Sequence, residues 1–240
     1  MSAFFNAAFY NPIYNALVAL MAFVPGGDVG VAVILLTIII RIILLPFSLS
    51  AARTQRAMKV LEPKIKELKE KHNGDKEKEA IETLALYREA QVNPFMSIVT
   101  VLIQIPILLA LYWVFLYEPF ETVNTARIYA LTPVPFGVSL QFLGIISVTG
   151  KSIVLAALAG VSQFYQAHMA LSGMGSPGTK VGTAGSFQQV MNMQLKYVFP
   201  ILIAVISYTT SGAIALYFIT TNLAGIVQEW YVKRDAGKKV

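Results

Sequence analysis

The stretch VGVAVILLTIIIRIILLPFSL at Val29–Leu49 decides the class of this protein. About 20 consecutive apolar residues can cross the hydrocarbon core of a bilayer, and only Arg41 places a charge inside this run. The whole chain of 240 residues has the same bias, with 56% hydrophobic and 13% charged residues and a mean hydropathy of +0.62. Because a soluble domain carries about 25% charged residues, this chain has too few charges to cover a water-facing surface. We therefore expect an all-α, polytopic membrane protein.

Further apolar runs follow along the chain. Two of them, Asn93–Tyr117 and Ser152–Leu171, each have the length of one span. The stretch Tyr197–Val232 is too long for one span, and the sequence Thr210-Ser211-Gly212 divides it into two short helices. We expect five transmembrane helices in a core of residues 29–232, at residues 29–50, 93–117, 152–171, 197–210 and 212–232.

The distribution of positive charges predicts the orientation. Sixteen of the 19 Lys and Arg residues fall within residues 51–92, 172–196 and 233–240. Only Arg127 and Lys151 fall in the other two loops. Since cytoplasmic loops carry an excess of Lys and Arg, we expect the N-terminus outside and the C-terminus, with its basic tail 233–240, in the cytoplasm.

Two apolar segments lie outside this count of spans. Residues 1–28 include the apolar stretch Ser2–Val24, which Asn11 and Asn15 interrupt, followed by a turn. A signal peptide or a sixth span is an alternative, but we favour an interfacial helix, because the polar residues are spread along the stretch. The segment Pro133–Val148 is short and contains two prolines, and we interpret it as an extracellular loop or an interfacial segment.

The polar segment 51–92 predicts a cytoplasmic helical hairpin. Leu61, Ile65 and Leu68 recur at helical spacing, and Asp75 is a candidate N-cap for a second helix. Two interpretations stay open. The hairpin is either a solvated loop held by i,i+4 ion pairs or a docking surface for a client or partner. Its candidate contact residues are Arg53, Arg56, Lys59, Lys64 and Lys66.

Arg41 is the most informative residue of the chain. It precedes Arg53 by 12 positions, roughly 18 Å along a helix at 1.5 Å per residue. A cation at this depth costs about 2.5–3.5 kcal/mol, and no Asp or Glu lies inside another predicted span before Glu229. Backbone carbonyls and lipid phosphate offer one environment for Arg41; we favour the other, a positively charged, water-accessible groove. The polar residues available to line it are Thr37, Gln104, Ser162, Gln163, Gln166, Thr220, Thr221 and Asn222.

Enzyme chemistry is not indicated by the sequence. The chain has no Cys, and its two His residues lack the spacing of metal ligands. The segment GMGSPGTKVG at Gly173–Gly182 has the order Gly-Thr-Lys where a phosphate loop needs Gly-Lys-Ser/Thr, so we interpret it as a cytoplasmic loop. There is no GxSxG motif and no intramembrane pair of Asp residues. We expect no enzymatic activity, no cofactor and no metal.

Three segments, in the correct order, resemble the YidC/Oxa/Alb family of membrane protein insertases over about residues 12–232. They are ILLTIIIRIILLPFSLSAARTQRAMKVLEPKIKELKEKH, ALYREAQVNPFMSIVTVLIQIPILLALYWVF and FPILIAVISYTTSGAIALYFITTNLAGIVQEW. The resemblance implies five core helices around a groove that is open to the cytoplasm and lipid and closed toward the outside. It assigns Arg41 as the groove arginine, Thr37 as its polar neighbour, Gln104 as the glutamine of the second span, and Tyr217 or Phe218 as the groove aromatic.

The resemblance also implies a function. It predicts an insertase and chaperone of the bacterial cell membrane that integrates newly made membrane proteins. The implied partners are client proteins and the bilayer, with the ribosome, the signal recognition particle receptor and the Sec translocon as further candidates, and no specific nucleic-acid site. The alternative is a small anion channel or transporter in which Arg41 selects anions.

Overall fold

The computed structural model describes residues 2–72, 75–93, 96–118, 120, 123–171 and 193–236. The segment 173–182 lies outside these residues. The prediction of a mostly helical chain is confirmed. The elements are α1 (Ala3–Phe5), η1 (Asn6–Tyr10), α2 (Asn11–Phe23), η2 (Pro25–Gly27), α3 (Val29–Ile43), α4 (Leu45–His72), α5 (Lys76–Glu89), α6 (Met96–Tyr117), η3 (Thr125–Arg127), β1 (Gln141–Phe142), β2 (Ile146–Ser147), α7 (Ile153–Leu171), η4 (Gln194–Val198), α9 (Phe199–Thr209) and α10 (Gly212–Ala236).

The first predicted span is broken in the structure. Helix α3 ends at Ile43, and α4 begins at Leu45 in a direction that differs by 63°. Pro46 lies in the first turn of α4, where its missing N–H leaves no helical hydrogen bond unmade. Among the described residues, no single helix meets the length and hydropathy expected of a membrane span; by these criteria alone, α3 together with residues 45–58 meets them as a bent pair. The count of five spans therefore stays a prediction.

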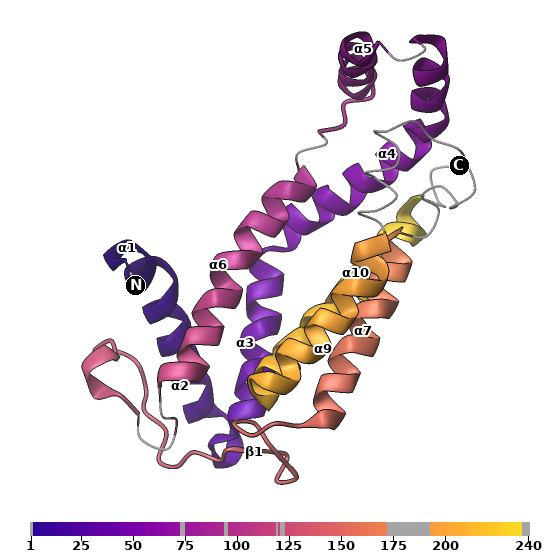
Figure 1. Ribbon diagram of the computed structural model, residues 1–240. Helices are drawn as coiled ribbons and strands as arrows, with labels where there is room; N and C mark the ends of the chain where they lie inside the picture. The colour runs from indigo at the N-terminus through magenta and orange to yellow at the C-terminus, as the bar shows by residue number, and fades with distance from the viewer. Residues whose placement is uncertain are drawn as a thin grey trace.

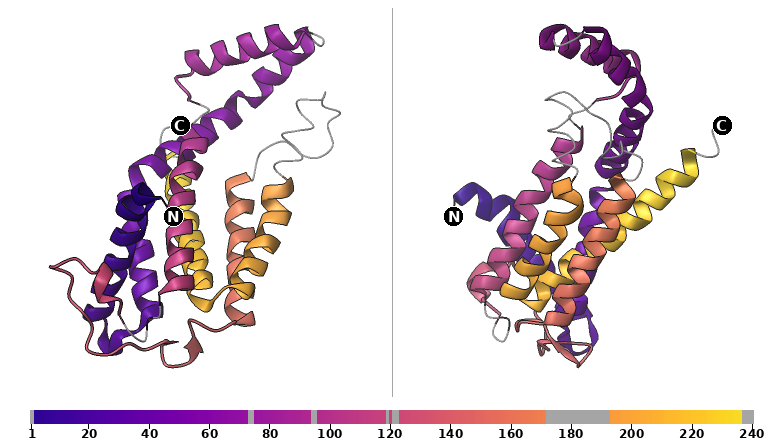
Figure 2. Two further views of the ribbon diagram at one scale, coloured as in Figure 1. Left: turned by 60° about the vertical axis from the view of Figure 1, so that its left-hand side comes forward. Right: turned by 45° about the vertical axis from the view of Figure 1, so that its right-hand side comes forward.

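The last two helices divide where their sequence predicts. Helix α9 ends at Thr209 and α10 begins at Gly212, whose N–H donates to the carbonyl of Gly150 at 3.0 Å. A Cβ atom at Gly212 would come within 2.7 Å of the Ser147 carbonyl oxygen, so glycine is needed at this close approach. Helices α7, α9 and α10 lie side by side in both views (Figure 1, Figure 2), and α10 also packs on α3.

Helix α2 is part of the packed bundle. Tyr10 of η1 and Tyr14, Leu17 and Met21 of α2 are fully buried in the core that also contains residues of α3 and α6. Asn15 of α2 is polar and is also buried, at 4% exposure. Because Asn15 is buried, its polarity does not by itself indicate an interfacial helix.

Asn15 binds the loop that follows α6. Its Nδ2 donates to the carbonyls of Asn11 at 2.8 Å and Arg127 at 2.9 Å. Its Oδ1 accepts from the N–H of Tyr129 at 2.7 Å and the hydroxyl of Thr132 at 2.8 Å. Three of the four hydrogen bonds of this buried amide thus attach the loop to α2, and the fourth lies within α2.

The segment between α6 and α7 closes one end of the bundle. Asp28 caps α3 by accepting from the N–H of Val31 at 3.0 Å, and its other oxygen accepts from the N–H of Leu143 at 2.7 Å. The carbonyl of Val148 accepts from Ala213 N at 2.8 Å. The starts of α3 and α10 are therefore joined to the β1–β2 turn, at the end of the molecule opposite α5 (Figure 1).

The predicted hairpin segment forms two helices that extend away from the bundle (Figure 2). Its first helix is the continuation of α4, so there is no break between the bundle and the hairpin. Asp75 caps α5, accepting from Lys78 N at 3.2 Å and pairing with Lys78 Nζ at 3.0 Å. His72 Nε2, at the end of α4, lies 2.9 Å from Glu82 Oε2 of α5 and joins the two helices.

Candidate functional site

Arg41 lies in the last turn of α3, just before the break between α3 and α4. Its side chain is half-buried, and its Nε is buried with no hydrogen-bond partner among the described residues. A buried guanidinium N–H that is unpaired carries a desolvation cost of about 1–3 kcal/mol or more. The hydroxyl of Tyr217 on α10 lies close enough to Arg41 to interact with it electrostatically. Arg41 is thus available to an acceptor that comes from outside the described chain.

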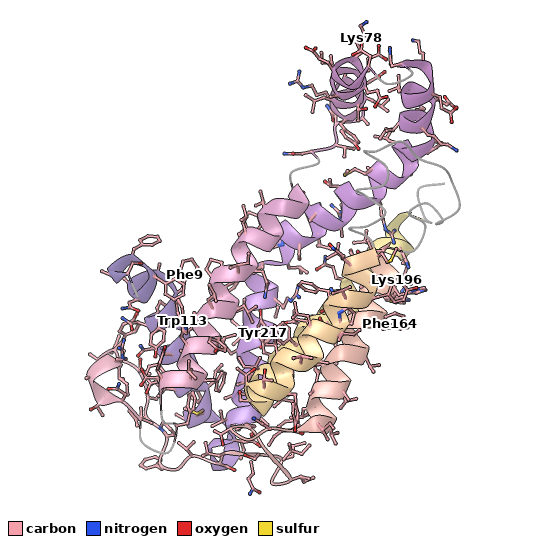
Figure 3. The ribbon with its side chains drawn as sticks, viewed as in Figure 1. Phe9, Lys78, Trp113, Phe164, Lys196 and Tyr217 are labelled. Carbon is pink, nitrogen blue, oxygen red and sulfur yellow. The ribbon has the colours of Figure 1, made fainter. Side chains whose placement is uncertain are left out.

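A polar contact between α6 and α10 lies beside Arg41. The Gln104 amide donates to the hydroxyl of Tyr217, and Tyr217 is only 1% exposed. The ring of Phe218 packs edge-on against Tyr217, with 5.4 Å between the ring centres. Figure 3 shows Tyr217 among the helices near the middle of the bundle. Three predicted site residues, from α3, α6 and α10, are therefore brought together: Arg41, Gln104 and Tyr217.

Thr37 and Gln163, which are also predicted groove residues, have different environments. Thr37 lies one turn before Arg41 and is buried, and its hydroxyl donates to the Val33 carbonyl at 2.7 Å within α3. Gln163 is half-buried on α7, and no hydrogen bond of the described residues joins it to Arg41. Its neighbour Ser162 instead accepts from Asn222 Nδ2 at 3.0 Å. This part of α7 therefore contributes a helix–helix contact with α10.

Contacts between α4 and α10 escaped the sequence reasoning. Ser48 Oγ donates to Gln228 Oε1 at 2.8 Å, and Gln228 Nε2 donates back to the Ser48 carbonyl at 2.9 Å. Arg56 Nη1 donates to the Val232 carbonyl at 2.8 Å, and its Nη2 lies 3.9 Å from a Glu229 oxygen. The signal was present, since Glu229 is an acid late in an apolar stretch, but its partner is far away in the sequence.

The hairpin cations therefore differ in their surroundings. Arg56 is held against the end of α10. Lys64 and Lys66 are exposed on α4, and Arg53 also has an exposed side chain that interacts within the chain. The side chain of Lys59 lies outside the described ones. Of this set, Lys64 and Lys66 present their charges to solvent.

At the opposite end of the bundle, a buried carboxylate joins three elements. Glu118 Oε1 accepts from the hydroxyl of Tyr10 at 2.7 Å and lies 3.2 Å from Arg127 Nε. Glu118 Oε2 accepts from Asn124 Nδ2 at 3.0 Å. Burial, and then the hydrogen bond to Glu118, raise the pKa of Tyr10, which keeps its hydroxyl a donor. This network attaches the N-terminal helices to the end of α6.

Comparison with known proteins identifies the family. The family described as 60Kd inner membrane protein matches residues 20–239. The chain belongs to this family. It is 31% identical over 230 residues to a membrane protein insertase YidC of Fusobacterium nucleatum, and the matched region covers 92% of this chain and 97% of that protein. It is 32% identical over 208 residues to a membrane protein insertase YidC of Francisella tularensis subsp. novicida, and the matched region covers 87% of this chain and 33% of that protein.

Family membership confirms the resemblance found in the sequence. The matched region begins at residue 20 and therefore contains α3, α6 and α10, the three helices that bring Arg41, Gln104 and Tyr217 together. The family description and the relatives' names place the chain among bacterial inner membrane proteins. The chain spans about a third of the length of the Francisella relative.

Proposed function

We propose that this chain, a membrane protein insertase by its family, receives the polar segment of a client beside Arg41. The observation that carries the proposal is the buried Nε of Arg41, which has no hydrogen-bond partner among the described residues. A client carboxylate or a water molecule would supply that partner. The nearby amide of Gln104 and hydroxyl of Tyr217 would accommodate further polar groups of the client.

The transfer follows from two opposing free energies. A polar segment loses hydration when it enters a bilayer, and a charged groove lowers this cost. The apolar helix of the client then gains about 25 cal/mol for each Å² that it removes from water. Ile42 and Ile43, which are 63% and 66% exposed next to Arg41, offer an apolar surface along which that helix can enter the lipid. No nucleotide hydrolysis is required.

The proposal includes five transmembrane helices, with the N-terminus outside and the hairpin in the cytoplasm. Single cysteines test it cleanly because the chain has none of its own. Lys78→Cys and Lys233→Cys should react with an impermeant maleimide only from the cytoplasmic side, and Thr125→Cys only from the outside. Labelling of Lys233→Cys from the outside would contradict this orientation.

We also propose that the hairpin contributes a docking surface. Lys64 and Lys66 are exposed on a helix that projects from the bundle. Replacing residues 62–89 by a short linker should leave the bundle folded and slow client insertion. Insertion at the normal rate by this variant would make the hairpin a solvated loop.

The decisive experiment uses purified protein alone in vesicles. A single-span client with an acidic N-terminal tail should integrate into these vesicles and not into protein-free ones. Anion flux is measured in parallel, because the rival function is an anion channel or transporter. Flux without client integration would favour the rival.

A further inference from the structure

The segment between Arg127 and Lys151 contains no charged residue. Several of its largest apolar side chains lie outside the core: Phe136 is fully exposed, Leu131 is 96% exposed and Ile145 is 81% exposed. Protein surfaces in contact with water seldom gather this much exposed apolar area at one end of the molecule. The segment runs along the lower end of the bundle in Figure 1, opposite α5.

These side chains are exposed on an ordered support. Asn15 of α2 binds residues 127–132 through three hydrogen bonds. Asp28 of α3 binds Leu143, and the carbonyl of Val148 binds α10. The contacts with three helices fix the position of the segment relative to the bundle. The apolar side chains therefore cannot fold back into the core without breaking hydrogen bonds.

Lipid is the partner whose chemistry fits this surface. The segment is uncharged, and the exposed Lys151 at its end matches the phosphate groups of lipid head groups. An open groove of about 560 Å³ lies between α2 and residues 129–133, beside Leu131, and Ala16 and Ala19 contribute to its walls. Phe23, at the end of α2, is also 77% exposed.

We propose that residues 128–150 are a lipid-binding anchor whose apolar side chains enter the acyl region of the outer leaflet. The side chains that make the contact are Leu131, Val134, Phe136, Leu143 and Ile145, all of them exposed. The proposal rests on the orientation given under Proposed function. An interfacial element of this kind buries its apolar side chains about 5–10 Å below the head groups.

The anchor has a consequence for Arg41. Asp28 is hydrogen-bonded to Leu143 of the anchor, and Arg41 follows Asp28 by 13 positions on α3. At 1.5 Å per residue this places Arg41 about 20 Å along the helix from the anchor. Because the hydrocarbon core is about 30 Å thick, an anchor in the outer leaflet holds Arg41 in the cytoplasmic half. The anchor thus sets the depth at which Arg41 meets a client.

Fluorescence quenching in vesicles of the full chain tests the anchor. Phe136→Cys and Leu131→Cys are labelled with bimane, and the exposed polar Gln141→Cys, in the same segment, is the matched control. Lipids brominated on their acyl chains should quench the probes at 136 and 131 several-fold more than the probe at 141. Iodide in the outside solution should quench the probe at 141 more strongly. Quenching of all three probes by iodide, with no quenching by brominated lipid, would overturn the proposal. A segment that docks a protein partner instead of lipid would give this result, because its side chains would be exposed to water in these vesicles.

A second measurement concerns depth. A bimane at Ile42→Cys, next to Arg41, is quenched by lipids brominated at different acyl positions. The double substitution Leu131→Asp and Phe136→Asp should move this probe toward the bilayer centre, because charged side chains draw the anchor outward. An unchanged depth would overturn the anchor's role. Client insertion is measured in the same vesicles. If the wild-type protein inserts clients normally but residues 128–150 are exposed to water, the anchor is refuted and the proposed function stands. If the wild-type protein inserts no client, the proposed function is refuted.

Discussion

The guanidinium of Arg56 donates a hydrogen bond of 2.8 Å to the main-chain carbonyl of Val232, although 176 positions separate the two residues in the chain. The bond joins the base of the hairpin on α4 to the end of α10. It therefore couples the orientation of the projecting hairpin to the helix that contains Tyr217.

Loss of this contact should free the hairpin. Arg56→Ala removes a hydrogen bond from a charged donor, worth about 1.5–3 kcal/mol, and the ion pair with Glu229 at 3.9 Å. Spin labels at Lys78 and Val227 should then show a broader distance distribution than in the parent protein. Lys64→Ala, an exposed change on the same helix, is the control and should leave the distribution as it is. A narrow distribution in Arg56→Ala would contradict the coupling.

The contact between Gln104 and Tyr217 should appear as a coupling energy. Gln104→Leu and Tyr217→Phe each remove the same hydrogen bond, so the second change should cost little after the first. A double-mutant cycle of unfolding free energies should give a coupling of about 0.6 kcal/mol, within the range to about 1.7 kcal/mol seen for polar contacts between membrane helices. The pair Gln104→Leu and Phe218→Leu should be closer to additive. A coupling of zero for Gln104 and Tyr217 would show that the bond does not stabilise the bundle.

Much of the fold follows from local patterns. Apolar runs bounded by polar residues predict helices close to those observed, such as 152–171 against α7 at Ile153–Leu171. The division at Thr210-Ser211-Gly212 follows from the excess length of its apolar stretch. The break between α3 and α4 was not predicted, because the run Val29–Leu49 is apolar apart from Arg41 and a few small polar residues, and only Pro46 signals a new helical turn.

Less of the site could be predicted. Arg41 stands out because its charge interrupts an apolar run, and this signal is local. The contacts of Arg56 with Val232 and of Glu118 with Tyr10, in contrast, span 176 and 108 positions, and nothing in the spacing of one residue reveals a contact at that range. Asn15 does not decide between two environments, since a polar residue on an apolar helix suits a buried amide as well as a membrane surface.

The buried Glu118 should be important for stability at the closed end. Glu118→Gln keeps the shape of the side chain and removes its charge, which weakens the bonds from Tyr10 and Arg127. We expect a loss of about 1–3 kcal/mol in the free energy of unfolding in detergent. Glu67→Gln, on the exposed hairpin, is the matched control and should change stability by less than about 0.5 kcal/mol. Equal effects of the two substitutions would contradict the role of Glu118.

Acidification should loosen the turn of the hairpin. The hydrogen bonds from the side chain and the N–H of Lys78 hold the pKa of Asp75 below its ordinary value. A lowered pKa in the folded state means that the stabilisation is fully present above the ordinary pKa of about 4. It is lost as the pH falls through the lowered pKa. Spin labels at Lys66 and Arg88 should therefore show a broader distance distribution in acid.

Asp75→Asn is the control for the acid effect, since asparagine also caps a helix but does not titrate. The labelled Asp75→Asn variant should show a distance distribution that changes less with pH. If both proteins respond equally to acid, Asp75 is not the group that titrates.

The central claim is that the charge of Arg41 serves the client and not the fold. Arg41→Ala removes a cation that costs about 2.5–3.5 kcal/mol in the membrane, so the variant should fold and keep or gain stability. Arg41→Lys retains the charge and should retain much of the activity if the groove supplies a diffuse field.

The most direct test measures insertion rates of single-span clients with acidic, neutral and basic tails by the wild type, Arg41→Lys and Arg41→Ala. We predict that Arg41→Ala slows the acidic-tailed client most, by roughly tenfold, which corresponds to about 1.4 kcal/mol of lost attraction, and slows the neutral-tailed client less. Equal losses for all three tails, or an unfolded Arg41→Ala protein, would contradict the account.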